Sequence, residues 1–244
     1  MANETRVDEI ATGVYRLSTF VPGTAGPAGL QFNQFLIDAE QPMLFHTGQR
    51  SLFPGVSAAV ARIMPLERLR WIGFSHIESD ECGALNEWLA AAPAATAMHS
   101  RLGCNIWLNE WAARPPRAMV DDERLDLGGK VVRWMATPHL PHGWDAGVVF
   151  EETTATLFPS DLFTQAGDPA ATTGGDILDP SLAVEKSFGF TSVTPTAPST
   201  TRRLADLAPR AIAAMHGSSF LGDGAATLRG LADFYAGRLR AAAV

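Results

Sequence analysis

The stretch Phe74-Ser-His-Ile-Glu-Ser-Asp-Glu-Cys-Gly83 places one imidazole and two carboxylates at alternate positions of the chain. These side chains belong to His76, Glu78 and Asp80. If the chain curls here, all three can converge on a metal ion, and mixed nitrogen and oxygen ligands suit iron, manganese or zinc. The alternative interpretation is a solvated polar loop.

The runs on either side of this stretch predict where it lies. Residues 69–74 are apolar and β-prone, which indicates a buried strand, whereas residues 84–92 are typical of a helix. The three metal-capable side chains therefore follow the end of a strand and precede a helix.

Metal-capable residues recur at later strand ends. His139 and His142 follow a strand-like run, Asp161 ends another apolar run, and His216 follows an alanine-rich run that is expected to be helical. Four junctions between a regular element and a loop thus end in such a residue. Surface polarity alone does not explain that repetition.

The order H-x-E-x-D, then His, Asp and His resembles the flavodiiron branch of the metallo-β-lactamase fold, which includes stand-alone oxygen-binding di-iron proteins. The resemblance covers about residues 14–236. It implies an α/β fold, the four-layer αββα metallo-β-lactamase sandwich, with two metal ions bridged by Asp161. The ions are expected to be iron, with zinc or manganese as alternatives. The metal ligands that it implies are His76, Glu78, Asp80, His142, Asp161 and His216.

The first motif departs from its relatives at one position. In the hydrolase branch it usually reads H-x-H-x-D-H; here Glu78 stands at the second position, as in the di-iron branch. The last position is Glu81, which departs from both patterns. Glu81 can coordinate, or it can point away and leave the second metal short of a ligand. His142 fits the family spacing better than His139, which is either a support for His142 or an alternative ligand.

Three other residues have weaker interpretations. His46 lies in His46-Thr47-Gly48, where the fold often has Asp-Thr-Gly. We interpret His46 as a buried, hydrogen-bonded strand-end residue, with a supporting role behind the metal ligands as the alternative. His99 lies on a separate strand without acidic neighbours in sequence and is interpreted as structural. Trp144 is expected near the pocket.

Composition narrows the class of protein. The chain has 244 residues, and we expect a single metallo-β-lactamase-like domain over residues 1–244. The formal net charge of −7, without a basic cluster, argues against nucleic acid as a partner. No signal peptide is visible, and no apolar run approaches the ~20 residues of a membrane span, so we expect a cytoplasmic protein. Cys82 and Cys104 are expected to be free thiols.

The order of predicted elements fits two packed sheets covered by helices. Strands are predicted at residues 13–20, 30–37, 42–46, 69–74, 94–99, 124–127, 130–136, 145–150 and 155–158. Helices are predicted at residues 51–64, 84–92, 100–113, 200–207 and 227–243. Residues 165–200 are rich in Gly, Pro, Ser, Thr and Asp and predict a long loop, with a short helix at 181–190. This loop is either a lid or wall beside the site or a subunit contact in a homo-oligomer.

Two classes of function follow. The first is a di-iron protein that binds, senses or reduces dioxygen or nitric oxide; its main support is Glu78. Because the chain ends at Val244, we expect no flavodoxin domain and therefore a separate electron donor. The second is a hydrolase of an ester, lactone, thioester or phosphoester that uses a metal-bound hydroxide. There Asp80 and Glu81 are the candidate catalytic acids. Either class acts on a small molecule, and a degenerate site with a binding or structural role is a third possibility.

Overall fold

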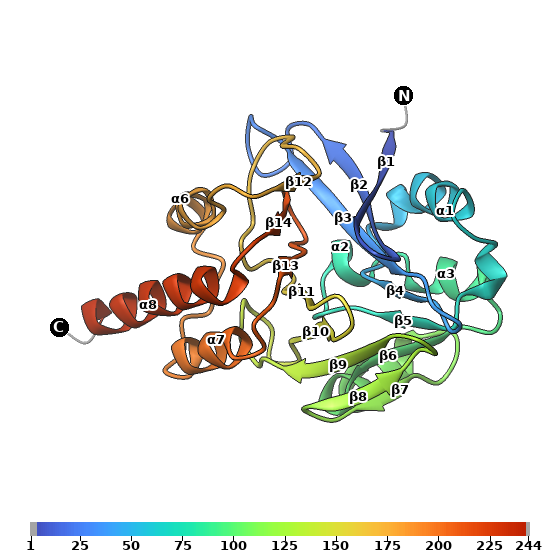
Figure 1. Ribbon diagram of the computed structural model, residues 1–244. Helices are drawn as coiled ribbons and strands as arrows, with labels where there is room; N and C mark the ends of the chain where they lie inside the picture. Colours follow the sequence, from blue (N-terminus) through green and yellow to red (C-terminus); the bar gives the residue numbers. More distant parts are fainter. Residues whose placement is uncertain (1–3, 243–244) are drawn as a thin grey trace.

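The computed structural model describes residues 4–242, which form two seven-stranded sheets with helices on both outer faces (Figure 1). The predicted α/β fold, an αββα sandwich of four layers, is confirmed. Among the described residues, no helix combines the length and apolar character that a membrane crossing requires.

The first sheet follows the chain in sequence order. Its strands are β1 (Thr5–Ala11), β2 (Val14–Val21), β3 (Leu30–Ile37), β4 (Met43–Phe45), β5 (Trp71–Gly73), β6 (Thr96–Ser100) and β7 (Arg117–Met119). The strands from β1 to β4 pair antiparallel, whereas those from β4 to β7 pair parallel. Parallel strands need crossovers, and the crossover that follows β5 carries the motif from His76 to Glu81.

The second sheet brings three strand ends to one edge. Its order is β12 (Thr172–Thr173), β14 (Ser219–Leu221), β13 (Ala211–Ile212), β11 (Thr156–Phe158), β10 (Gly147–Glu151), β9 (Val131–Ala136) and β8 (Glu123–Asp126). β10 pairs antiparallel with β9 and with β11, and β11 pairs parallel with β13. The carboxyl ends of β9, β11 and β13 therefore share an edge, and the loops that follow them start there.

Helices form the two outer layers. The helices α1 (Phe53–Ala61) and α3 (Leu85–Ala91) pack on the first sheet, to the right in Figure 1. On the left, the second sheet is covered by α6 (Leu178–Phe188), α7 (Ala197–Ala205) and α8 (Gly224–Ala242). The shorter helical segments are Arg50–Leu52, Leu66–Arg68, α2 (Ser79–Cys82), α4 (Arg101–Gly103), Cys104–Leu108 and α5 (Asn109–Trp111).

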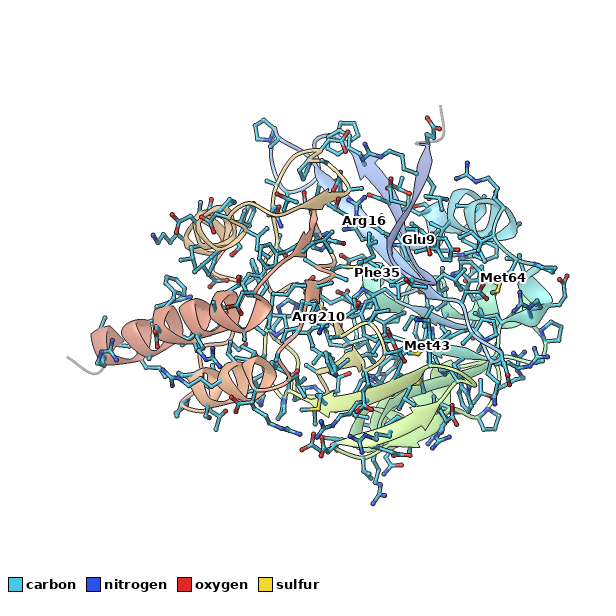
Figure 2. The ribbon with its side chains drawn as sticks, viewed as in Figure 1. Glu9, Arg16, Phe35, Met43, Met64 and Arg210 are labelled. Carbon is cyan, nitrogen blue, oxygen red and sulfur yellow. The ribbon has the colours of Figure 1, made fainter. Side chains whose placement is uncertain are left out.

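Three apolar cores fill the spaces between the four layers. One lies between the first sheet and its helices and includes Trp88, and another lies beneath α6, α7 and α8 and includes Leu228. The third joins the two sheets face to face, and Phe35 and Met43 belong to it (Figure 2). The sheets are thus held as one framework around the loops at their shared edge.

Several elements differ from the sequence expectations. The short strands β7, β12, β13 and β14 were not predicted, and the alanine-rich run before His216, which was expected to be helical, contains β13. β1 was not predicted; it is an edge strand with half-buried charged side chains, which disguise the apolar alternation. The helix predicted at residues 100–113 is interrupted by a π-helical segment at Cys104–Leu108. In this wider turn the Trp107 indole donates a hydrogen bond to Asp145, on the other sheet's loops.

The segment 165–200 contains regular structure. It includes β12, α6 and the start of α7, so the short helix expected within it begins three residues earlier than predicted, at Leu178. The last predicted helix corresponds to α8, and its expected end at residue 243 lies outside the described residues. Cys82 and Cys104 are free thiols, as expected, and both are buried.

Candidate metal centre

Four loops bring seven polar side chains together at the shared edge of the sheets. The loop after β5 and the first turn of α2 supply four of them, and the loops after β9, β11 and β13 supply one each. The Gly147 amide, at the start of β10, donates to the Ser75 carbonyl across the two sheets at 2.9 Å. We call these seven residues the acid–histidine cluster: His76, Glu78, Asp80, Glu81, His142, Asp161 and His216.

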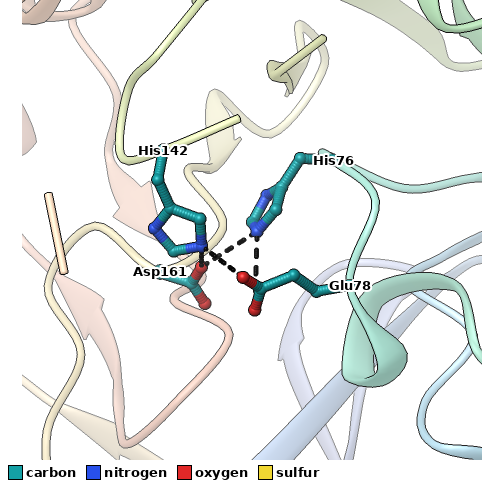
Figure 3. A group of neighbouring side chains, drawn as sticks. All are labelled: His76, Glu78, His142 and Asp161. Atoms are coloured by element: carbon teal, nitrogen blue, oxygen red, sulfur yellow. Dashed lines mark ion pairs between the residues drawn. The ribbon is translucent and has the colours of Figure 1, made fainter. Parts of the chain in front are cut away.

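One half of the cluster surrounds a single oxygen of Asp161 (Figure 3). Asp161 Oδ2 lies 3.5 Å from Nε2 of His76 and 3.5 Å from Nε2 of His142. Glu78 closes this group, because its Oε1 is 3.0 Å from His142 Nε2 and its Oε2 is 3.9 Å from His76 Nε2. Donor atoms of these four residues all lie within 4.8 Å of one another, a spacing that can hold a metal ion.

The other half of the cluster faces the second oxygen of Asp161. His216 Nε2 lies 3.3 Å from Asp161 Oδ1 and 3.3 Å from Asp80 Oδ2. Asp161 therefore directs one carboxylate oxygen into each half. A carboxylate in this position can bridge two cations, since it offers each of them one oxygen and offsets their mutual repulsion.

Glu81 points into the cluster, which resolves the two orientations that the sequence left open. Its side chain is fully buried, and its Oε1 lies 3.9 Å from His76 Nε2 and 3.4 Å from the Ser160 hydroxyl, which donates to it. Glu81, Asp80 and Glu78 form a second group, in which one carboxylate oxygen of each residue lies close enough to the others to hold an ion.

The charges of the cluster are strongly coupled. Burial raises the pKa of Glu81 well above its usual range, and the neighbouring Asp161 and Asp80 raise it further. Burial favours neutral His216, but the carboxylates of Asp161 and Asp80, each with an oxygen 3.3 Å from Nε2, outweigh it and raise the pKa of His216 to about 10. The close contact with the His142 ring, 3.0 Å away, lowers the pKa of Glu78 to about 2. The protein has thus concentrated negative charge where a cation would be stabilised.

Several cluster atoms are buried and have no hydrogen-bond partner among residues 4–242. They are His76 Nε2, both ring nitrogens of His142, Glu81 Oε2 and both carboxylate oxygens of Asp161. A buried polar atom left unpaired costs about 1–3 kcal/mol. Imidazole nitrogens and carboxylate oxygens are also the donors that divalent metals take. The cluster therefore fits metal ions by both its chemistry and its unsatisfied atoms.

Hydrogen bonds behind the cluster fix the orientation of two histidine rings. The Nδ1 atom of His76 lies 2.9 Å from the hydroxyl of Ser75, which in turn contacts the hydroxyl of Ser160 at 2.6 Å. The Nδ1 atom of His216 donates to the Gln31 carbonyl at 2.7 Å. Each contact engages Nδ1 and leaves Nε2 facing the cluster. Metal-binding histidines are generally held in this way, by a hydrogen bond at the ring nitrogen that does not bind the metal.

Polar residues of β3 were not identified from the sequence, although they hold the loop that carries His216. The Asn33 side-chain amide donates to the carbonyls of Ala214 and Gly217 at 3.0 and 2.9 Å. Arg16, buried on β2, donates to the Gly217 carbonyl at 3.0 Å. Gln31 and Asn33 are polar residues within an otherwise apolar strand, and that pattern was the available signal.

The remaining histidines lie outside the cluster. His139 is exposed, and among the described residues it belongs to neither group of side chains that are close enough to hold a metal ion. His46 is buried at the end of β4, where its Nδ1 contacts the Met215 sulfur at 2.7 Å and burial lowers its pKa to about 3. The Thr47 amide beside it donates to the Glu81 carbonyl at 2.7 Å, so this turn supports α2.

His99 has an acidic partner that is distant in sequence. Its Nε2 forms a hydrogen bond with Oδ2 of Asp145 at 3.0 Å, and its Nδ1 lies 3.2 Å from the Phe74 carbonyl oxygen. Asp145 lies three residues after His142, and Phe74 lies two residues before His76. This buried pair therefore joins the two loops that supply those histidines, one from each sheet.

A pocket of about 250 Å³ opens onto the cluster. Its floor consists of Glu78, His142, Asp161 and His216, and its walls are mainly apolar. Trp144 is 39% exposed and does not line it. The walls come from the loop before β3 and the first residue of that strand, the loop after β11, and the C-terminal half of α6 with the turn that follows: Ala25, Leu30, Thr164, Ala166, Val184, Phe188 and Phe190.

With this geometry established, comparison with known proteins identifies the family. The family model described as "ODP family beta lactamase" matches residues 30–217, a range that contains the whole acid–histidine cluster. This chain belongs to that family. The family and the flavodiiron-like fold that the motif order suggested are therefore confirmed.

Solved structures share the fold at low sequence identity. The metal-soaked Flv1 flavodiiron core from Synechocystis sp. has a TM-score of 0.81 at 18% identity, covering 96% of this chain and 61% of that chain. The rubredoxin oxygen:oxidoreductase from Desulfovibrio gigas has a TM-score of 0.78 at 18% identity, covering 93% of this chain and 62% of that one.

A diflavin flavoprotein fragment, residues 1–254, from Nostoc sp. has a TM-score of 0.81 at 17% identity, covering 99% of this chain and 97% of the fragment. This chain therefore spans less than two thirds of the Synechocystis and Desulfovibrio chains and nearly all of the fragment. No curated protein sequence matches it.

Proposed function

We propose that this protein holds a dinuclear iron centre that binds, senses or reduces dioxygen or nitric oxide. The observation that carries the proposal is the orientation of Asp161, whose Oδ2 faces His76 and His142 while its Oδ1 faces His216. One carboxylate between two groups of nitrogen and oxygen donors is what a pair of metal ions requires.

The proposed ligand sets follow the two halves of the cluster. The first ion would take His76, Glu78, His142 and Asp161 Oδ2. The second would take Asp80, Glu81, His216 and Asp161 Oδ1. Four carboxylates give an oxygen-rich site, which favours iron or manganese over a metal that prefers soft thiolate ligands.

Bound iron would supply the redox chemistry, exchanging electrons with dioxygen or nitric oxide. The chain's own residues do the rest. The carboxylates of the cluster offset the charge of the ions, and the contacts to Ser75 and the Gln31 carbonyl keep Nε2 of His76 and His216 directed inward. The apolar walls limit water at the floor of the pocket and admit a small uncharged gas.

Further support comes from family membership and from the names of the structural relatives, which include flavodiiron proteins and an oxygen:oxidoreductase. No feature of the described residues favours the hydrolase alternative. We propose that electrons come from a separate donor and that the protein acts in the cytoplasm.

The test is a direct comparison of two metal forms. Protein purified without added metal is analysed for metal content, reduced anaerobically and then exposed to dioxygen while its absorption spectrum is recorded. The proposal predicts bound iron and a spectral change on oxidation that depends on added reductant. A zinc-loaded sample is incubated with a panel of lactones and esters. Rapid hydrolysis by that sample, together with an iron form that is inert to dioxygen, would overturn the proposal.

A further inference from the structure

The pocket over the acid–histidine cluster is larger than a diatomic gas requires. Its volume is about 250 Å³, whereas a small molecule the size of water occupies roughly 30 Å³ in the liquid. An apolar cavity of about 150 Å³ is large enough to hold benzene. The pocket therefore has room for one aromatic ring with a short substituent beside the cluster.

The polar and apolar side chains of the pocket lie on opposite sides of it. Leu30 and Val184 face it from different layers of the fold, and Phe190 stands edge-on to His142, with ring centroids 6.0 Å apart at 84°. Phe188 also lines it, although 54% of this side chain is exposed. The polar floor thus lies opposite an apolar wall.

The phenylalanine wall is anchored to the rest of the protein. Between the two phenylalanines, Gly189 takes a left-handed backbone conformation that ends α6. On the buried side of the helix, Glu185 accepts hydrogen bonds from the Thr191 hydroxyl at 2.8 Å and from Arg238 of α8 at 2.5 Å. These contacts fix the turn, so the pocket is a preformed cavity.

We infer that this site binds a small organic molecule that has a single aromatic ring or a branched apolar body and one oxygen-bearing headgroup. The headgroup faces the floor at Glu78, Asp161 and His216, and the apolar body fills the space beside Val184 and Phe190. No lysine or arginine is among the described residues that line the pocket, so it offers no partner for a second anionic group. The inference deepens the proposed function by naming an organic ligand class, and it rests on that proposal for the metals at the floor.

The test uses phenol as the probe on full-length, iron-containing protein, with binding measured by saturation-transfer NMR. Methanol, which has the headgroup without the ring, serves as the negative ligand. Val184→Trp fills the pocket from α6. Ala166→Trp fills it from an exposed position, where a large side chain is less disruptive to folding. Val120→Trp is the matched control, because Val120 is 40% exposed and lies away from the pocket.

We expect saturable phenol binding by the wild type, no saturable methanol binding, and at least tenfold weaker phenol binding in both pocket-filling variants. The Val120→Trp variant should bind as the wild type does. Absence of saturable phenol binding would overturn the inference, and so would unchanged binding in Ala166→Trp. Wild-type oxidation by dioxygen is recorded on the same samples. If that reaction fails while phenol binding persists, the proposed function is rejected and the organic-ligand inference stands.

Discussion

At the scale of single residues, Glu81 is the position at which this sequence departs from both motif patterns that it resembles. Its carboxylate is fully buried within the cluster, and its Oε1 lies 3.9 Å from Nε2 of His76. We expect Glu81→Ala to lose the second metal ion and to retain the first, whose donors His76, Glu78 and His142 are untouched. Glu81→His should restore the second ion, because histidine returns a donor at the same position.

Metal analysis of the three proteins, each checked for folding by circular dichroism, measures this effect. Equal metal content in wild type and Glu81→Ala would show that Glu81 is not a ligand. A variant that loses both ions would mean that Glu81 organises the whole cluster instead of one half of it.

The two cysteines give a prediction at the same scale that does not depend on metals. Burial raises the pKa of Cys82 to about 12 and that of Cys104 to about 11. Since the thiolate is the reactive form, both should react with Ellman's reagent far more slowly in the native protein than in denaturant. Fast labelling of either thiol in the folded state, at the rate of a free thiol, would contradict their burial.

At the scale of the secondary-structure elements, the His99–Asp145 pair joins β6 of the first sheet to the loop between β9 and β10 of the second. Removing one member of a buried ion pair leaves a charge without a partner and typically costs ~3–5 kcal/mol. We expect His99→Ala to lower the free energy of unfolding by about this amount. Because removing both partners leaves no orphaned charge, the His99→Ala, Asp145→Ala double variant should lose less than the sum of the single losses. Urea denaturation of all four proteins tests this, and strict additivity would contradict the coupling.

The same pair predicts a pH dependence. Burial alone would raise the pKa of Asp145, but hydrogen bonds from His99 and Trp107 outweigh it and hold that pKa below its usual value. A carboxyl whose pKa is lower in the folded protein than in the unfolded chain stabilises the fold above the unfolded value, ~3.9 for aspartate. This contribution is lost as the pH falls through the folded value. Asp145→Asn should therefore flatten the loss of stability as the pH falls below about 4, and an unchanged slope would contradict it.

Local sequence patterns predicted some of the strands and helices and missed others. The runs that became β2, β3 and β9 are apolar or alternating over most of their length, so local pattern was sufficient. β1 and the π-helical segment at Cys104–Leu108 were missed because tertiary packing determines both. β1 is stabilised by pairing with β2, and Trp107 in the π segment contacts Asp145 from the opposite sheet.

At the scale of the whole molecule, the polar strand ends could be predicted but their mutual geometry could not. The strand order of the second sheet brings the loops after β9, β11 and β13 to one edge. A local sequence pattern can predict where a strand ends, but it does not predict which strands are neighbours in the sheet. The packing of the two sheets determines which oxygen of Asp161 faces which histidine. It also determines whether Glu81 points into the cluster. The apolar pocket likewise combines residues as distant as Leu30 and Phe190.

The bridging role of Asp161 is the central claim, and metal stoichiometry tests it most directly. Protein expressed in iron-supplemented medium is analysed for iron per chain in three forms: wild type, Asp161→Ala, and the control Asp233→Ala, which removes an exposed aspartate of α8. We expect two irons per chain in the wild type and in the control. We expect less than one in Asp161→Ala, because both halves of the cluster lose an oxygen donor at once. A wild type with a single iron, or an Asp161→Ala variant that retains two, would contradict the dinuclear centre.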